Sequence, residues 1–344
     1  MPAEWEPQRA VHLAWPANKE DWPGKFQPIP WVITEIIRQA TAEGGRVFLA
    51  AVSERHAAQA RRFLLRVEVD AARVDIVVRP LDRGWMRDIS PFFVTGPKGA
   101  RAAVRFRFNG WAKYGNHKLD DQWPAFSTKE RGWPLVEAVW NGAPVVLEGG
   151  AVDSNGRGAL LTTEECLLDP ETQTRNPGFT RKDYEGLFRK WLGIRQVIWL
   201  GKGIAGDDTH GHVDDLCRFV NPNTVVLCRE PDGKDANHRA LEENRERLQG
   251  VRLANGQSLD VVELPMPAPV VFDGMRLPAS YANFLIAYGR VIVPTFNDPN
   301  DRKALGILAE LFPDRVVAGV HAVDLVWGLG TVHCLSHEEP EVSG

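Results

Sequence analysis

Cys334 is the residue of this chain whose chemistry is most readily stated. It ends the segment 328–334 (Gly-Leu-Gly-Thr-Val-His-Cys), so a glycine-spaced turn presents a thiol directly after the imidazole of His333. A thiolate is a strong nucleophile, and a neighbouring positive charge or a bound cation lowers the pKa of the thiol. The alternative is a cysteine that only packs, because free cysteine is among the most buried residue types. The choice depends on whether other segments supply the partners that a nucleophile needs.

Asp88 belongs to a segment that could hold a cationic ligand. It ends the segment 84–88 (Gly-Trp-Met-Arg-Asp), in which its carboxylate could bind the charge while the indole of Trp85 covers the apolar part of the ligand. The alternative is that Asp88 caps a helix or pairs with Arg87 at the surface. The segment therefore indicates a binding residue only if a site forms around it.

Glu148 stands at the end of an apolar run, 145–147 (Val-Val-Leu), and Gly149 and Gly150 follow it. Burying an acid without a partner is costly, so an acid at the end of a buried strand suggests a purpose. Two glycines let a ligand or another stretch of backbone approach closely. The alternative is a solvated glutamate in the turn after a strand.

The segment 207–215 (Asp-Asp-Thr-His-Gly-His-Val-Asp-Asp) concentrates imidazoles and carboxylates. In an extended chain His210, His212 and Asp214 would share one face, and Asp215 would take the other. An imidazole beside a carboxylate suits proton transfer next to a bound cation. The same three residues are an adequate ligand set for a metal ion, and a polar structural turn is the third alternative.

Together these segments supply a thiol, imidazoles and several carboxylates. A cysteine–histidine pair alone suggests acyl transfer, but that reaction needs an oxyanion hole rather than a ring of carboxylates. Carboxylates instead suit a planar cation with several N–H donors, namely a guanidinium, which two of them can bind in fork geometry. The bound cation would in turn stabilise the thiolate.

Composition narrows the class of protein. The chain has 344 residues and a net charge of −4, so nothing points to nucleic acid or to an anionic membrane surface. No signal peptide is apparent, and no apolar run approaches the roughly 20 residues of a membrane span. The four cysteines lack paired spacing, which favours a reduced, cytoplasmic setting. Among twelve tryptophans, Trp85 and Trp111 lie in polar contexts, where either aromatic walls around a ligand or core packing would explain them.

Strand and helix patterns alternate, which predicts an α/β fold that must position these side chains. Turn-rich stretches at 109–132 and 169–178 are predicted as surface loops that could cover a site, and Thr180, Asp235 and Asp298 are predicted to cap helices. Strands are predicted at 46–52, 74–78, 102–108, 144–147, 196–200, 224–228, 259–264, 291–294 and 315–319. Helices are predicted at 31–42, 54–65, 182–192, 237–248 and 301–311.

The segments that carry the candidate site residues recur at similar spacing along the chain. Asp88, Glu148 and His212 lie 60 and then 64 residues apart, and the region 283–301 and Cys334 continue the series. A repeat of about 65–70 residues, five per chain, would place one functional strand end per repeat around a common axis. The units are not obviously alike in sequence, so the spacing alone supports the repeat.

Five ordered motifs resemble the agmatine deiminase family, which also includes the bacterial peptidyl-arginine deiminase type. The resemblance implies the pentein fold, a five-bladed α/β propeller of ββαβ-type pseudo-repeats, as a single domain over residues 1–344. The motifs are 1–7 (Met-Pro-Ala-Glu-Trp-Glu-Pro) with 14–16 (Ala-Trp-Pro), 85–88 (Trp-Met-Arg-Asp), 148–150 (Glu-Gly-Gly), 211–215 (Gly-His-Val-Asp-Asp) and 330–334 (Gly-Thr-Val-His-Cys).

The resemblance also implies an activity, the hydrolytic deimination of a guanidinium substrate, with agmatine giving N-carbamoylputrescine and ammonia. It assigns roles as follows: Cys334 is the nucleophile that forms a thiouronium intermediate, His212 is the general acid and base, Glu148 orients or charge-balances His212, Asp88 and Asp214 bind the guanidinium, and Trp85 contacts the substrate. No metal or organic cofactor is implied. The implied partner is a small cationic guanidine, with no nucleic acid and no membrane, and a homodimer is left open.

Several alternatives remain at this level. Arg105 and Arg107 share one strand face and, if they face the site, could bind a carboxylate and favour arginine or peptidyl-arginine. Amidino transfer to an amine would use the same first half-reaction. A metallohydrolase built on His210, His212 and Asp214, or a guanidine-binding module without activity, belongs to another class. The chain also departs from the family after the nucleophile, where 335–340 (Leu-Ser-His-Glu-Glu-Pro) replaces the usual glutamines.

Overall fold

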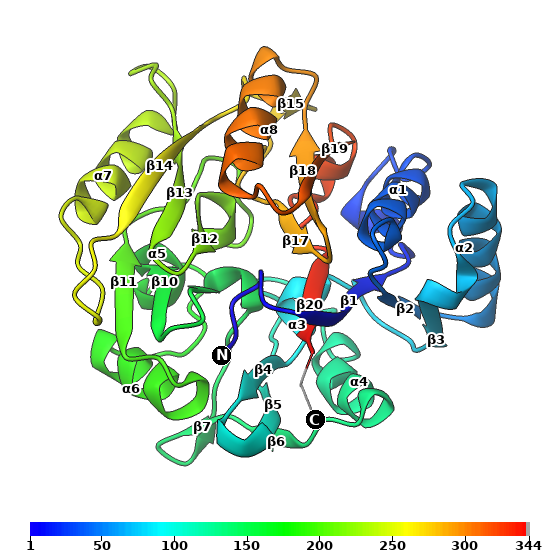
Figure 1. The fold of residues 1–344 in the computed structure, drawn as a ribbon, viewed down its shortest axis with the longest axis horizontal. Helices are drawn as coiled ribbons and strands as arrows, with labels where there is room; N and C mark the ends of the chain where they lie inside the picture. The colour runs from blue at the N-terminus through cyan, green and yellow to red at the C-terminus, as the bar shows by residue number, and fades with distance from the viewer. Residues whose placement is uncertain (342–344) are drawn as a thin grey trace.

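The computed structural model describes residues 1–341 and contains, within that range, five mixed sheets of three or four strands (Figure 1). In each sheet an antiparallel pair is followed by a parallel pair. The sheets are β4 (Phe92–Thr95), β5 (Arg101–Arg105) and β6 (Leu135–Glu137); β9 (Asp153–Ser154), β10 (Ala159–Thr163) and β11 (Gln196–Leu200); β12 (Cys217–Asn221), β13 (Thr224–Arg229) and β14 (Asp260–Pro265); β17 (Leu285–Ala287), β18 (Arg290–Thr295) and β19 (Val316–His321); and β20 (Ser336–Pro340), β1 (Gln8–Ala14), β2 (Val47–Ala51) and β3 (Val74–Val78). Two further two-stranded ladders join β7 (Val139–Trp140) to β8 (Ala143–Pro144) and β15 (Val271–Phe272) to β16 (Met275–Arg276).

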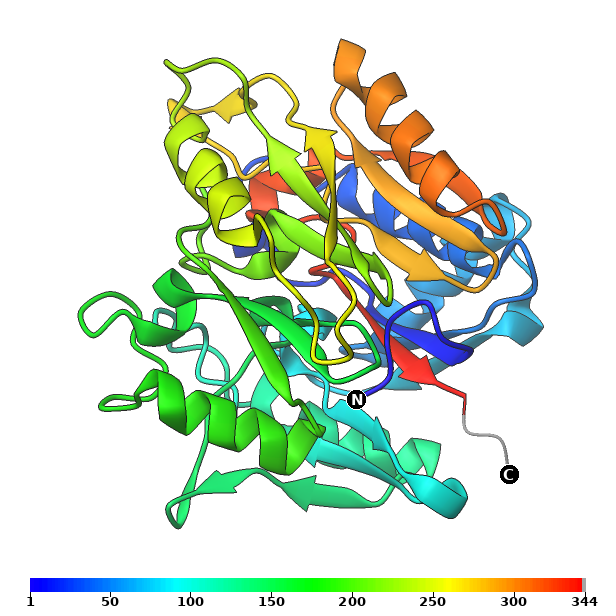
Figure 2. The same cartoon turned by 60° about the vertical axis from the view of Figure 1, so that its left-hand side comes forward.

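Each parallel pair needs a crossover, and a helix supplies it. Figures 1 and 2 show these helices toward the outside of the molecule, with the sheets inside. The α-helices are α1 (Ile29–Thr41), α2 (Glu54–Arg66), α3 (Met86–Ile89), α4 (Trp123–Arg131), α5 (Glu164–Leu168), α6 (Arg181–Leu192), α7 (His238–Leu248) and α8 (Pro299–Leu311). Short 3-10 turns are η1 (Lys19–Asp21), η2 (Ala71–Arg73), η3 (Pro97–Gly99), η4 (Asp120–Gln122), η5 (Gly149–Ala151), η6 (Val213–Asp215) and η7 (Leu325–Gly328).

Local sequence explains most of these elements. Helix α1 buries Ile33, Ile36, Ile37 and Ala40, which is the spacing of one helical face. Helix α6 begins with a capping box in which Thr180 and Asp183 bond reciprocally, so the predicted Thr180 cap is confirmed. Asp298 likewise caps α8. Before α7, Asp235 accepts a bond from the backbone of Asn237, which is itself the residue at the cap position.

The last described strand lies beside the first. Strand β20 pairs antiparallel with β1, with Ser336 opposite Leu13 and His337 opposite His12, and Figure 2 shows the N-terminus close to β20. Residues 336–340, in the segment where the sequence departs from the family that it resembles, therefore form a structural strand. Glu339 is fully buried there and pairs with Arg131 at 2.7 Å.

Most predicted elements are confirmed to within a few residues, but three expectations were wrong. The predicted strand 144–147 forms only β8 and one bridge between Arg107 and Val146, because the Asn176 side chain hydrogen-bonds the N–H and C=O of Val146. The predicted loop 109–132 contains α4. The segment 207–215 is not extended, since His210 has a φ of +66° and the chain turns there.

The five larger sheets remain separate, and none of the sheets formed by residues 1–341 closes on itself. Helices in the described part of the chain also fall short of the length and apolar content that a membrane crossing requires.

Candidate active site

In each of the five larger sheets, a short polar segment comes directly before the first strand. These five segments meet at a common site. Asp88 lies in α3 before β4, and Glu148 precedes η5 and β9. The segment 212–215 precedes β12, Asn283 precedes β17, and Cys334 precedes β20. The contacts described below bring these segments together, so the regular spacing along the chain corresponds to one position repeated in five structural units.

The Cys334 thiol is buried among hydrogen-bond partners and carboxylates. The Asn283 side chain donates to its Sγ at 3.0 Å, and an oxygen of Asp214 lies 3.7 Å from the Sγ. Burial, together with Asp214, Asp215 and Asp88, raises the pKa of the Cys334 thiol well above its usual value. The thiol is therefore protonated when no cation is bound to these carboxylates.

His333 does not activate the thiol, contrary to what its place in the sequence suggests. Its Nδ1 lies 2.6 Å from Asp214 and its Nε2 lies 2.9 Å from Glu4, so both nitrogens face carboxylates rather than sulfur. The positive charge that a thiolate needs must come from elsewhere.

His212 lies between two carboxylates. Its Nδ1 is 3.9 Å from Asp88, its Nε2 is 3.9 Å from Glu148, and among residues 1–341 no group hydrogen-bonds either ring nitrogen. Burial opposes protonation, but Asp88, Cys166 and Glu148 outweigh it and raise the His212 pKa well above its ordinary value. The imidazole is therefore held as a cation that can give up a proton.

Asp88 is fixed by two donors on the side facing His212. The indole of Trp111 donates to Oδ2 at 2.8 Å and the backbone of Gly150 donates to Oδ1 at 3.0 Å. Burial raises the pKa of Asp88 to about 6, with His212 opposing that shift. A Cβ on Gly150 would lie 2.4 Å from Nδ1 of His212, so only glycine leaves room for the imidazole here.

Arg175 is a site residue that sequence reasoning missed. It lies in the loop 169–178, where its Nε donates to Glu148 at 3.1 Å and its other nitrogens bind the carbonyls of Gln173 and Thr209. Burial would raise the pKa of Glu148, but Arg175 and His212 lower it to about 2. No pattern in this loop distinguishes Arg175 from a solvated arginine, so only the fold identifies it.

Asp214 and Asn283 complete the site. His333 occupies Oδ2 of Asp214, while Oδ1 is buried and has no hydrogen-bond partner within the described chain. The sequence pointed to Asn283 only as the start of the region 283–301, which continues the regular spacing of the site segments. Its oxygen accepts from Thr331 at 2.7 Å and from the backbone of His333 at 3.0 Å, which anchors the turn that carries Cys334.

A cavity of about 110 Å³ opens onto Cys334 and Asp88. Trp85, which stacks on Trp22 with ring centroids 5.6 Å apart, forms part of its wall. The other lining residues are aromatic or polar: Trp111, Tyr114, Glu20, Asp21, Arg83, Asp208 and Thr209, together with Gly328, Leu329 and Gly330. The lining of the cavity thus combines the thiol, carboxylates and aromatic side chains.

The His210, His212 and Asp214 ligand set is not assembled. The positive φ at His210 turns its side chain to Asp169, 2.8 Å away, while His212 and Asp214 lie within the site. Two other groups have ligand atoms within 4.8 Å of one another: Glu148 with Cys166 and His212, and Asp214 with Asp215 and Cys334. These are the groups of this site that could hold a metal ion.

Arg105 and Arg107 do not line the cavity, so the condition under which they could bind a carboxylate there is not met. Both pair with Asp121, Arg105 at 3.2 Å and Arg107 through its Nε at 3.0 Å, and Arg105 also pairs with Glu137. The arginine that does line the cavity is Arg83.

Comparisons with known proteins agree with this geometry. The agmatine deiminase of Stutzerimonas stutzeri is 33% identical over an alignment of 361 positions that covers 99% of this chain and 95% of that protein. The solved agmatine deiminase of Enterococcus faecalis matches with a TM-score of 0.90 and 29% identity over 99% of this chain and 95% of its own. An amidinotransferase of Microseira wollei, 13% identical with a TM-score of 0.52 over 100% and 98% of the two chains, shares the fold alone. The profile of the Porphyromonas-type peptidyl-arginine deiminases matches residues 1–340, so the chain belongs to that family of guanidine-modifying hydrolases, which act on C–N bonds.

Proposed function

We propose that this protein hydrolyses agmatine to N-carbamoylputrescine and ammonia. The observation that carries the proposal is that Cys334 and Asp88 line one cavity, with Asp214 3.7 Å from the sulfur and His212 3.9 Å from Asp88. The unpartnered Oδ1 of Asp214 is an acceptor that a guanidinium N–H would satisfy. The names of the relatives support the substrate.

The first half-reaction begins when the guanidinium binds to Asp88 and Asp214. Its positive charge lowers the pKa of Cys334, the thiol loses its proton to solvent, and the thiolate attacks the guanidinium carbon. His212 then gives its proton to one nitrogen, and the C–N bond breaks to release ammonia. A covalent S-alkylthiouronium remains on Cys334.

The second half-reaction uses the same groups. His212, now neutral, takes a proton from water, and the hydroxide attacks the thiouronium carbon. The C–S bond breaks and the electron pair returns to sulfur, which takes the hydroxyl proton of the intermediate and becomes the thiol again. The neutral ureido product then leaves, while His212 keeps the proton that it took from water. Glu148, kept ionised by Arg175, stabilises the imidazolium at each stage where His212 carries the proton.

The charges at the mouth of the cavity favour a cationic tail over a carboxylate. Arg83 is paired with Asp21 at 2.7 Å, and Lys113 is paired with Asp208. Both nearby cations are therefore already neutralised, whereas Glu20 also lines the cavity. The ammonium of agmatine meets this surface without displacing an ion pair, but the carboxylate of arginine would have to compete for one.

We also propose how the five sheets are arranged and where in the cell the protein is located. The five sheets with one strand plan support a pentein propeller that comprises residues 1–344 as a single domain. The four cysteines, all buried and unpaired, support a cytoplasmic location, where thiols stay reduced.

The test is an assay of ammonia release from agmatine, arginine and a blocked peptidyl-arginine in one buffer. We expect kcat/KM to be highest for agmatine. A tenfold or greater advantage for arginine or the peptide would overturn the assignment, because it would require a carboxylate or peptide subsite that the paired Arg83 does not provide.

A further inference from the structure

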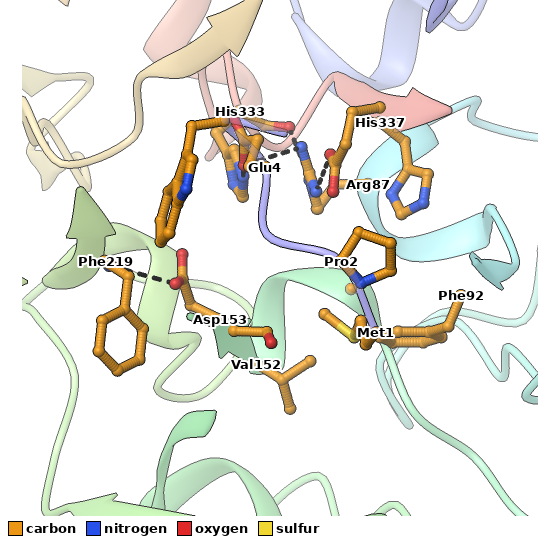
Figure 3. Close-up of a pocket in the computed structure, with 14 residues that line it drawn as sticks. Met1, Pro2, Glu4, Arg87, Phe92, Val152, Asp153, Phe219, His333 and His337 are labelled. Atoms are coloured by element: carbon orange, nitrogen blue, oxygen red, sulfur yellow. Dashed lines mark hydrogen bonds and ion pairs between the residues drawn. The ribbon is translucent and has the colours of Figure 1, made fainter. Parts of the chain in front are cut away.

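The N-terminal segment reaches the back of the active site through Glu4. Its Oε1 accepts from the backbone of Ile286 at 2.7 Å, its Oε2 accepts from Arg218 at 2.6 Å, and the same Oε2 lies 2.9 Å from Nε2 of His333. Arg87 lies 3.7 Å from the same oxygen. Glu4 thus contacts four segments that are distant in the chain, and Figure 3 shows it beside His333 and Arg87.

A second, small cavity of about 30 Å³ lies on this side. His333 and Arg87 line it, whereas the residues that follow each of them, Cys334 and Asp88, line the substrate cavity. One layer of backbone therefore separates the two cavities. A contact made by Glu4 in the second cavity is only one residue away from the thiol.

His333 connects Glu4 to the substrate cavity. Because Glu4 holds Nε2 and Asp214 holds Nδ1, the ring is fixed at both ends. Fixing Oδ2 of Asp214 against Nδ1 leaves Oδ1 as the free acceptor. Without the Nε2 contact the ring would be free to rotate, and Asp214 would lose the donor that determines which of its oxygens is free.

We propose that Glu4 is a positioning residue of the active site, which acts through His333 to hold Asp214 in the orientation that binds the guanidinium. The inference rests on the proposed function, because it assumes that Asp214 binds substrate. It makes the segment before β1 part of the binding machinery, although Glu4 lies outside the substrate cavity.

The test measures agmatine binding in the Cys334→Ser background by calorimetry, so that turnover does not interfere. Glu4→Gln keeps the side-chain size, but its NH2 group must replace one carboxylate oxygen, either the one that faces the backbone N–H of Ile286 or the one that faces Arg218 and Nε2 of His333. We expect the Kd for agmatine to rise about tenfold, the usual effect of losing one hydrogen bond to a charged group. In the enzyme with Cys334 intact, kcat/KM falls by a similar factor.

A second pair of variants keeps the test decisive if Glu4→Gln folds poorly. His333→Asn places an amide N–H near the position of Nδ1 and so can still donate to Asp214, whereas His333→Ala cannot. We expect His333→Asn to recover most of the affinity that His333→Ala loses. Equal losses in both variants would contradict positioning through Nδ1.

Two controls separate positioning from general stability. Glu338→Gln removes the partner of Arg87, 2.8 Å away, in the same second cavity, and Glu6→Gln removes a partner of Arg157 in the same N-terminal segment. Both should leave the Kd unchanged. If Glu338→Gln weakens binding as much as Glu4→Gln, or if Glu4→Gln binds normally, the inference is wrong. If Asp214→Asn itself binds agmatine normally, the proposed function fails instead.

Discussion

His212 is held in a setting that few histidines experience, with a carboxylate 3.9 Å from each ring nitrogen and no hydrogen bond to either. The charges favour the imidazolium, while the missing hydrogen bonds leave its protons available to a ligand. At Cys334, burial and then the surrounding carboxylates raise the pKa of the thiol, so its protonated form is favoured. At the scale of single residues, these charges suit a positively charged ligand.

Cys334→Ser should abolish ammonia release, because a serine hydroxyl has a far higher pKa and no base is hydrogen-bonded to this position. Cys217→Ser is the control and should keep most activity, since Cys217 is buried in β12 away from the substrate cavity. Ammonia release at nearly the wild-type rate from the Cys334 variant would rule out the covalent mechanism.

His212→Ala should lower kcat by about a hundredfold or more, the usual contribution of proton transfer. His210→Ala should have a much smaller effect, because His210 pairs with Asp169 outside the site. Steady-state kinetics with agmatine compares the two variants. Similar losses at both positions, with metal in the purified protein, would favour a metallohydrolase.

Arg175→Met should move the acid limb of the kcat/KM profile to higher pH. Arg175 lowers the pKa of Glu148, so without it burial raises that pKa and Glu148 takes up a proton at a higher pH. His212 then loses one of the charges that support its protonated form. Arg181→Met, which removes an exposed arginine of α6 paired with Glu164, is the matched control and should leave the pH profile unchanged.

At the scale of elements, the site depends on short segments that come just before a strand. The sheet holds one end of such a segment, and the other end can form a short 3-10 turn, as in η5 and η6. Gly150 shows how little space this leaves, because its backbone binds Asp88 and its missing Cβ makes room for His212.

Gly150→Ala should therefore lose most activity while the protein still folds. The new methyl group would lie 2.4 Å from Nδ1 of His212 and 3.1 Å from Asp88, so the imidazole must move. Gly306→Ala in α8 is the control, since no atom lies within 4 Å of its added Cβ and alanine favours helix by about 1 kcal/mol. Normal kcat/KM in Gly150→Ala would show that the position of His212 is not critical.

At the scale of the whole molecule, β20 and β1 join the end of the described chain to its start. Glu339 is central to this closure, since it binds Arg131, His12 and the indole of Trp133 while fully buried. The acidic residues that depart from the family pattern are thus internal ion-pair partners, and Glu338 holds Arg87 in the same way.

Glu339→Gln should lower the free energy of unfolding by about 3 kcal/mol, because it removes the charge of a fully buried carboxylate that pairs with Arg131 and His12. Burial opposes the shift, but His12 and Arg131 lower the pKa of Glu339 from 4.5 to about 2, so this stabilisation is present above pH 4.5 and is lost as the pH falls toward 2. Urea unfolding of both proteins at several pH values should show the difference shrinking over that range. A difference that does not depend on pH would contradict the ionic origin, and Glu341→Gln, at an exposed position, is the control.

The sequence by itself determined the family, the chemistry and most helices and strands, because motif residues and hydrophobic periodicity are local properties of the chain. Cys334, His212, Asp88, Glu148 and Asp214 were all named as site residues from the sequence, and the roles assigned to them stay predictions. Only the tertiary structure decided which histidine faces the site, that Arg175 and Asn283 belong to it, and that Arg105 and Arg107 do not. The strand β20 was also missed, because its Ser-His-Glu-Glu-Pro sequence lacks an apolar pattern. The physical reason is the same in each case: these side chains are defined by partners that lie up to hundreds of residues away, and no local pattern records the partner.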